Sequence, residues 1–109
     1  MSIDKKIITQ EEFNAMKSVY DKQIKPQLGA AYTEFVYIDI SDLKAYIERV
    51  EKQAQSNETV VKGIKFYMVS QDNEKAQMTL VLQAAFDNEK VEADLMNRFD
   101  LCPPICDPE

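Results

Sequence analysis

Residues 33–55, TEFVYIDISDLKAYIERVEKQAQ, decide the fold because a β pattern passes directly into an α pattern. β-branched and aromatic side chains dominate 33–40 and alternate between two sides of the chain, which predicts a strand with both faces partly covered. Ser41 then offers a helix N-cap, and apolar side chains recur at helical spacing. These helical positions are Leu43, Tyr46, Ile47, Val50 and Ala54. The sequence therefore predicts a helix over 42–55 directly after the strand.

Upstream of this stretch, Thr9 and Glu12 have the spacing of a capping box, in which each side chain accepts a hydrogen bond from the other residue's backbone N–H. A helix is therefore expected to begin at Thr9, after an N-terminal arm over residues 1–8. Pro26 cannot donate a backbone hydrogen bond, so the helix is expected to end near Lys25. One apolar face is predicted for this helix, made of Phe13, Met16, Val19 or Tyr20, and Ile24.

Downstream, two β runs over 60–70 and 76–86 are separated by the polar residues 71–75 and predict an antiparallel hairpin. Gly63 interrupts the first run and is expected at a bulge or a close backbone approach. The side chains expected on the core side of this run are Ile64, Phe66 and Met68. A short helix is predicted beyond Phe86, from the near-helical spacing of Val91, Leu95, Met96 and Phe99.

These elements predict an α+β fold of order α-β-α-β-β with a final short helix. The path from the strand at 33–40 through the helix to the next strand resembles a right-handed crossover, which makes the first two strands parallel. The hairpin then adds an antiparallel strand. The prediction is a small three-stranded mixed sheet with the helices packed on one face, in a single domain over 1–109.

Composition limits the possible partners. The chain has 13 basic and 19 acidic side chains, and no basic stripe, so neither nucleic acid nor an anionic membrane surface is expected as a partner. Apolar runs are far shorter than the roughly 20 residues of a membrane helix, and the N-terminus has no signal-peptide core. Two cysteines at one end do not form the framework of a small secreted protein. A cytoplasmic location is therefore expected, with a precursor whose signal has been removed as the alternative.

Enzymatic chemistry has little support. The chain has no histidine, which removes the commonest general base and the commonest transition-metal ligand. Its 2 glycines are too few for a phosphate-binding loop. No catalytic, cofactor-binding or metal-binding residue is assigned, and no cofactor is expected. A carboxylate-based enzyme acting on a small substrate stays as an alternative, because the acidic side chains are numerous.

Cys102 and Cys106 enclose Pro103, Pro104 and Ile105 in a tail over 100–109 that is expected to be extended and rich in proline. A polyproline path rises about 3.1 Å per residue, which would place the two cysteine Cα atoms about 12 Å apart, against at most ~7 Å for a disulfide. A disulfide would need a turn at Pro104-Ile105 or a cis proline. The favoured expectation is therefore that the cysteines pack as small hydrophobic side chains. A thiol redox site and a structural metal site at this pair are the alternatives, the latter needing carboxylates or a partner's cysteines as further ligands.

Tyr37 and Tyr67 each lie on the strand face opposite the expected core, and they are the candidate interface residues. Exposed aromatic side chains on a sheet face that helices leave uncovered are typical of a contact surface. The leading hypothesis is therefore a non-enzymatic protein-interaction module that binds itself, as a homodimer, or another protein.

Three segments carry a resemblance to known proteins: Ile40–Ile47 (ISDLKAYI), Gly63–Tyr67 (GIKFY) and Leu101–Cys106 (LCPPIC). They resemble a group of small uncharacterised bacterial proteins that end in Cys-Pro-Pro-x-Cys. This resemblance implies an α+β layout and a bacterial, cytosolic setting. It assigns no role to any residue, because no activity of the group can be transferred.

Overall fold

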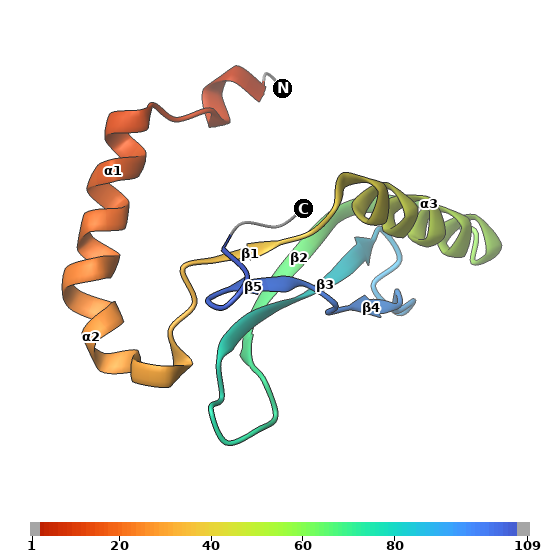
Figure 1. Ribbon diagram of the computed structural model, residues 1–109. Helices are drawn as coiled ribbons and strands as arrows, with labels where there is room; N and C mark the ends of the chain where they lie inside the picture. The colour runs from red at the N-terminus through yellow and green to blue at the C-terminus, as the bar shows by residue number, and fades with distance from the viewer. Residues whose placement is uncertain (1–2, 107–109) are drawn as a thin grey trace.

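The structure is a computed structural model that describes residues 3–106, and it has the predicted α+β fold with two small antiparallel sheets. A helical arm (residues 3–31) precedes a body that contains the remaining helix and all the strands (Figure 1). The arm contains a 3-10 turn (Ile3–Lys6), α1 (Gln10–Val19), a π turn (Tyr20–Ile24), α2 (Lys25–Leu28) and a 3-10 turn (Gly29–Ala31).

The capping box at the start of α1 is confirmed. Thr9 Oγ1 accepts a hydrogen bond from Glu12 N at 3.0 Å, and Glu12 Oε1 accepts one from Thr9 N at 3.1 Å. The predicted end near Lys25 is wrong, because helical backbone continues to Leu28. Pro26 lies in the first turn of α2, where its missing N–H is tolerated. The α-helical backbone ends at Leu28, and its C-cap Gly29 has a φ of +54°, which suits a residue without a Cβ.

The core forms where α3 (Ile40–Ser56) packs on the hairpin of β2 (Val61–Ser70) and β3 (Met78–Phe86). The predicted helix and hairpin are both confirmed, although the N-cap of α3 is Asp39 and Ser41 lies in the first turn. Val50 is 1 % exposed, and it belongs to the buried cluster that joins helix and hairpin. The members of that cluster are Tyr46, Val50, Ala54, Leu82, Ala84, Phe86 and Ala93.

The strand order corrects the predicted mixed sheet. β1 (Phe35–Tyr37) does not join β2 through a parallel crossover, but pairs antiparallel with β5 (Asp100–Cys102). The three-stranded sheet has the order β2-β3-β4, and both of its pairings are antiparallel. The tail, expected to be extended with its cysteines packed as small hydrophobic side chains, begins with the strand that pairs with β1.

The predicted helix after Phe86 is also wrong. The segment forms the short strand β4 (Leu95–Met96), which pairs with Leu82 and Gln83 of β3. Ala93 is buried in the core, and β4 pairs with the edge of β3 that β2 leaves free, so tertiary packing overrides the weak helical spacing. In the hairpin, the register shift between Val61 and Gly63 confirms the predicted bulge.

The arm stands apart from the sheets and gives the molecule an open shape (Figure 1). The radius of gyration is 16.5 Å, whereas a compact chain of this length has about 13 Å. None of the residues between 3 and 32 is buried. Among residues 3–106, no helix is both long and apolar enough to cross a membrane.

Candidate functional site

Cys102 and Cys106 form a disulfide, which overturns the expected extended tail. Their Cα atoms are 4.5 Å apart, and the peptide bonds Cys102-Pro103 and Pro103-Pro104 are both cis. A cis bond shortens the distance between successive Cα atoms from 3.8 to about 2.9 Å, so the chain turns back where a trans polyproline path would extend. The disulfide therefore forms through cis prolines, one of the two conditions expected to allow it.

The loop that carries the disulfide is also held by hydrogen bonds that do not involve sulfur. Glu34 N donates to Cys102 O at 2.6 Å, and Ile105 N donates to Leu101 O at 2.8 Å. The Gln77 side chain, buried beside β3, donates to Pro103 O. These bonds tie the loop to the residue before β1 and to the hairpin, so its position depends on more than the covalent bridge.

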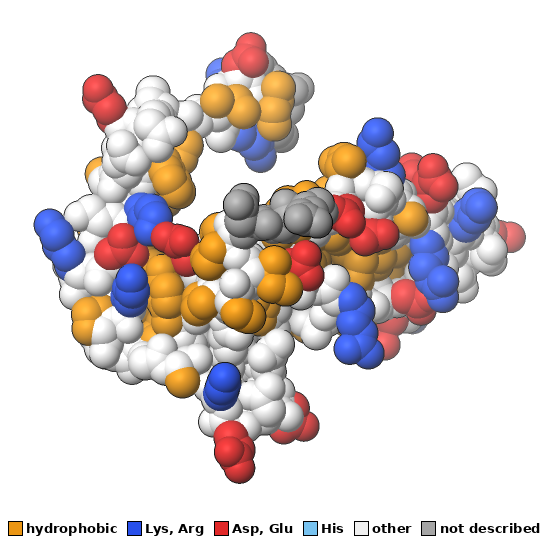
Figure 2. Space-filling model, viewed as in Figure 1, with side chains coloured by type: hydrophobic (Ala, Val, Ile, Leu, Met, Phe, Trp, Pro, Cys, Tyr) orange, Lys and Arg blue, Asp and Glu red, His pale blue; other side chains and the backbone are white. Residues whose placement is uncertain are grey.

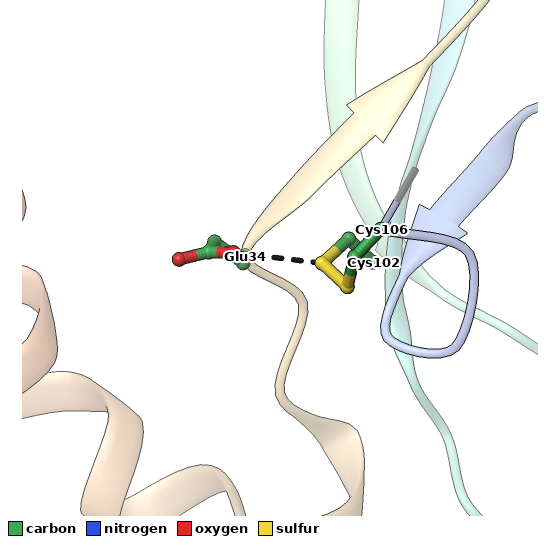
Figure 3. A group of neighbouring side chains, drawn as sticks. All are labelled: Glu34, Cys102 and Cys106. Carbon is green, nitrogen blue, oxygen red and sulfur yellow. Dashed lines mark hydrogen bonds between the residues drawn. A yellow bond between two sulfur atoms is a disulfide. The ribbon is translucent and has the colours of Figure 1, made fainter. Parts of the chain in front are cut away.

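Glu34 lies beside the disulfide, between the tail and the helical arm (Figure 3). Its Oε2 atom is 3.5 Å from Cys102 Sγ. A disulfide sulfur has no proton to donate, so this distance is a contact that can become a hydrogen bond only in the thiol form. The other carboxylate oxygen, Oε1, is 2.8 Å from Lys17 Nζ of α1. Glu34 therefore connects α1 to the end of β5.

Lys17 holds two carboxylates at once, Glu34 at 2.8 Å and Asp21 at 3.1 Å. The hydrogen bond with Glu34, followed by the one with Asp21, raises the pKa of Lys17 well above its usual range. The ammonium group consequently remains charged at any physiological pH. Because the side chains of Lys17 and Glu34 are 33 % and 37 % exposed, solvent screens this pair and it contributes little to stability.

The potential ligand atoms of Glu34, Cys102 and Cys106 lie within 4.8 Å of one another. Cys102 is buried, while Cys106 and Glu34 are exposed. As a disulfide, the cysteines are not metal ligands, but as thiolates they would be. The arrangement can therefore support reversible dithiol–disulfide chemistry, or hold a cation in the reduced form.

Sequence reasoning identified the two cysteines but missed Glu34 and Lys17. Glu34 reaches the cysteines only because β1 pairs with β5 in a register that places Phe35 opposite Cys102. That pairing joins segments that are far apart in the sequence, and no local sequence pattern predicts it. The requirement for carboxylate ligands in a chain without histidine was the only available signal, and it did not single out one acid.

The two candidate interface tyrosines lie in different sheets. Tyr37 is half-buried in β1 opposite Asp100, and Tyr67 is 44 % exposed in β2 opposite Val81. Tyr67 also receives the Lys65 ammonium over its ring, at 5.4 Å from the centroid. The structure does not bring the two tyrosines onto one strand face, and their role in an interface stays a prediction.

Two residues expected in the core are instead among the most exposed apolar side chains. Phe66 is 59 % exposed and Met68 is 81 % exposed, although Ile64 on the same strand packs against the core. Their partners across the hairpin are Leu82 and Leu80. The core face was therefore predicted correctly, but α3 covers only the part of it near Ile64. Phe66 and Met68 form an uncovered sheet patch.

The helical arm carries a second exposed apolar surface, which lies along its predicted apolar face (Figure 2). Tyr20 is the exception, because its ring lies 5.9 Å from that of Tyr32 and its hydroxyl donates to Thr33 O at 3.0 Å. The remaining members form the arm stripe, with exposures of 47 % for Phe13, 64 % for Met16, 53 % for Val19 and 42 % for Ile24.

A groove of about 690 Å³ runs between α3 and β4, and Asp42 and Asp94 are its acidic residues. Arg49 Nε lies 2.6 Å from Asp94 Oδ2. Hydrogen bonds from Gln53 and from Arg49 lower the pKa of Asp94, which keeps it ionised near neutral pH. Asp94 is therefore an ion-pair partner and a poor general acid, and the carboxylate-enzyme alternative stays a prediction.

Comparison with known proteins finds no matching family model, no matching curated protein and no matching solved structure. The function of this chain is therefore argued from its own residues.

Proposed function

We propose that this protein is a non-enzymatic self-association module, in which the arm stripe of one copy packs on the sheet patch of a second copy. The observation that carries the proposal is that one chain exposes two separate apolar surfaces, one on a helix and one on a sheet. A helix face and a sheet face are the two surfaces that pack on each other in α+β layers.

The arm requires an explanation, because an amphipathic helix owes most of its stability to the packing of its apolar face. No strand within residues 3–106 packs extensively against α1. Polar contacts tie this part of the arm to the body, from Lys17 of α1 to Glu34 and from Tyr20, directly after α1, to Thr33. Packing on a second copy would supply the apolar contact that α1 lacks.

The sheet patch is suited to receive a helix. β2 is an edge strand of its sheet, and the patch continues the face on which α3 already packs. The helical path from residue 10 to 28 is about 28 Å long at 1.5 Å per residue. The ten residues of β2 span about 33 Å, so the strand as a whole is about as long as the helical path, while the sheet patch occupies only its part around Phe66 and Met68.

The available area is that of a modest stable interface. The six side chains of the arm stripe and sheet patch leave on the order of 650 Å² of apolar surface exposed per copy, taking a large side chain as roughly 150–250 Å². Reciprocal packing of two copies would bury about 1,300 Å², within the range of about 1,200–2,000 Å² for specific complexes. Two identical contacts related by a two-fold axis would close the assembly as a dimer.

The test is the molar mass in solution, measured by sedimentation equilibrium for the wild type and for two charge insertions. We expect a dimer at tens of micromolar, and monomers for Met16→Glu in the arm stripe and Met68→Glu in the sheet patch. Asn14→Glu places the same charge two residues before Met16, about 200° around α1 and away from the arm stripe, and Gln71→Glu places it in the hairpin turn. Both controls are expected to remain dimeric.

Mixing the two monomeric variants separates arm-to-sheet packing from other modes. Each mixed pair can form one intact contact, from the arm of Met68→Glu to the sheet of Met16→Glu, so partial recovery of dimer is expected. If the wild type is monomeric at tens of micromolar, the proposal fails. If Met68→Glu dimerises as the wild type does, the arm packs elsewhere and the proposed contact is wrong.

The compartment bears on the state of the cysteines. The cytoplasmic setting expected from the sequence would keep most thiols reduced, whereas a disulfide persists in oxidising compartments. The self-association proposal holds in either setting, because neither the arm stripe nor the sheet patch contains a cysteine.

A further inference from the structure

We propose that the dithiol form of this protein binds one Zn²⁺ ion through Cys102 Sγ, Cys106 Sγ and a carboxylate oxygen of Glu34. This site is independent of self-association, since it uses none of the residues of the arm stripe or the sheet patch. It adds a carboxylate ligand from the other end of the chain to the two cysteines.

The spacing of the ligand atoms suits zinc. With Zn–S bonds of about 2.3 Å and Zn–O bonds of about 2.0–2.2 Å, the ligand atoms of a tetrahedral site lie roughly 3.5–3.8 Å apart. The three ligand atoms already lie within 4.8 Å, and Glu34 Oε2 is 3.5 Å from Cys102 Sγ. The two sulfurs must separate by roughly 2 Å after reduction. Cys106 is exposed, so its side chain has room to rotate.

The scaffold around the cysteines does not depend on the disulfide. The bond from Glu34 N to Cys102 O, the bond from Ile105 N to Leu101 O and the donation from Gln77 all remain possible after reduction. The pairing of Phe35 with Cys102 keeps Glu34 beside the thiols. The reduced site is therefore largely organised before the ion arrives, which lowers the entropic cost of binding.

Lys17 completes the charge balance and orients the carboxylate. Two thiolates and one carboxylate carry three negative charges, of which Zn²⁺ neutralises two, and the Lys17 ammonium, which also pairs with Asp21, lies beside the remaining one. Lys17 Nζ contacts Oε1, while the second oxygen, Oε2, faces Cys102 (Figure 3). A partner that holds one oxygen of a ligating carboxylate is a common way to orient a metal ligand.

Formation of the site is a balanced two-electron step. A dithiol reductant, such as a protein with a Cys-x-x-Cys motif, gives two electrons and two protons to the Cys102–Cys106 bond and becomes a disulfide itself. Zinc then displaces the two thiol protons, which are released to solvent. Within residues 3–106 the cluster offers three ligand atoms, so water completes the tetrahedron.

The experiment is a zinc titration of the reduced, metal-free full chain under anaerobic conditions, in competition with a chromophoric chelator. One equivalent of zinc is expected to bind the reduced chain, and none to bind the oxidised chain. Cobalt in place of zinc is expected to give a thiolate-to-metal charge-transfer band, which reports sulfur ligation directly. Circular dichroism of every variant checks that the fold is retained.

Cys102→Ser and Cys106→Ser are each expected to abolish binding. Glu34→Gln is expected to weaken it at least ten-fold, while Glu92→Gln, which neutralises an exposed carboxylate outside the cluster, leaves it unchanged. If the reduced wild type binds no zinc, the site does not exist. If Glu34→Gln binds as tightly as Glu92→Gln, Glu34 is not a ligand and the proposed three-ligand site is wrong.

Discussion

The hydroxyl of Tyr46 is expected to contribute more to stability than any other single polar group of the core. It accepts a hydrogen bond from Ala84 N at 2.9 Å and donates one to Asp94 O at 2.8 Å. Tyr46 is 6 % exposed and Ala84 is 4 % exposed. The hydroxyl therefore joins α3 to β3 and to the segment before β4 in a place that water does not easily reach.

The change Tyr46→Phe removes this hydroxyl and leaves the ring packing intact. Asp94 O is only half-buried, so water can replace its lost donor. The Ala84 N–H is buried in the core and would be left without an acceptor, which costs about 1–3 kcal/mol. We expect a decrease of about 2 kcal/mol in the free energy of unfolding, in the middle of this range.

The assay is urea unfolding followed by far-ultraviolet circular dichroism, at one protein concentration for all variants because self-association would stabilise the folded state. The midpoint is expected to fall by about 1–2 M urea. Tyr67→Phe is the matched control, because that hydroxyl makes no hydrogen bond with a described residue and its side chain is 44 % exposed. Equal midpoints for the two variants would refute the role assigned to the Tyr46 hydroxyl.

Three further predictions test the core and the tail. Val50→Ala creates a small cavity at a position that is 1 % exposed, so it is expected to lower the free energy of unfolding by about 2 kcal/mol in the same urea assay. The control is Ala15→Gly at an exposed position of α1, which should lower the free energy of unfolding by no more than about 1 kcal/mol. Burial, more than any other cause, raises the pKa of Tyr46, so the folded state favours the neutral phenol. The stability that this group contributes is therefore fully present below about pH 10 and is lost as the pH rises above it, and Tyr46→Phe should reduce that loss in a pH series of thermal melts. Reduction of the Cys102–Cys106 bridge opens a loop with a sequence separation of 4 and is expected to lower the free energy of unfolding by about 2 kcal/mol, measured by calorimetry in metal-free buffer with and without a dithiol. An unchanged melting temperature would show that the surrounding hydrogen bonds alone hold the loop.

Local patterns predicted the elements that depend on neighbours in sequence. The capping box at Thr9 and Glu12 satisfies backbone donors within one turn, and the apolar spacing in α3 needs only one face to be buried. The hairpin of β2 and β3 is likewise set by alternation and a short polar turn. These features were predictable because their physical causes lie within a few residues of each other.

The errors at the candidate site come from long-range strand pairing and from the peptide-bond geometry of the tail. β1 was expected beside β2, because a helix between two strands usually forms a crossover, yet the strand at Phe35–Tyr37 pairs with residues 100–102. The steric rule used for Cys102 assumed trans bonds, and the cis bonds turn the chain back. Glu34 could not be predicted as a candidate ligand, because its place beside Cys102 depends both on the pairing of β1 with β5 and on the turn at the cis prolines.

The small size of the core gives a physical reason for both self-association and zinc binding. The helical arm contributes no buried residue, so the core is built by the body over residues 33–106 alone. A chain of roughly 70–80 residues supplies only a few kcal/mol from one hydrophobic core, and such proteins commonly add a covalent staple, a metal or a partner. The tail provides the staple at the end of β5, where two short strands have little core of their own. A zinc ion in the reduced form would restore the same closure, and packing of the arm on a second copy would enlarge the apolar surface that each body buries.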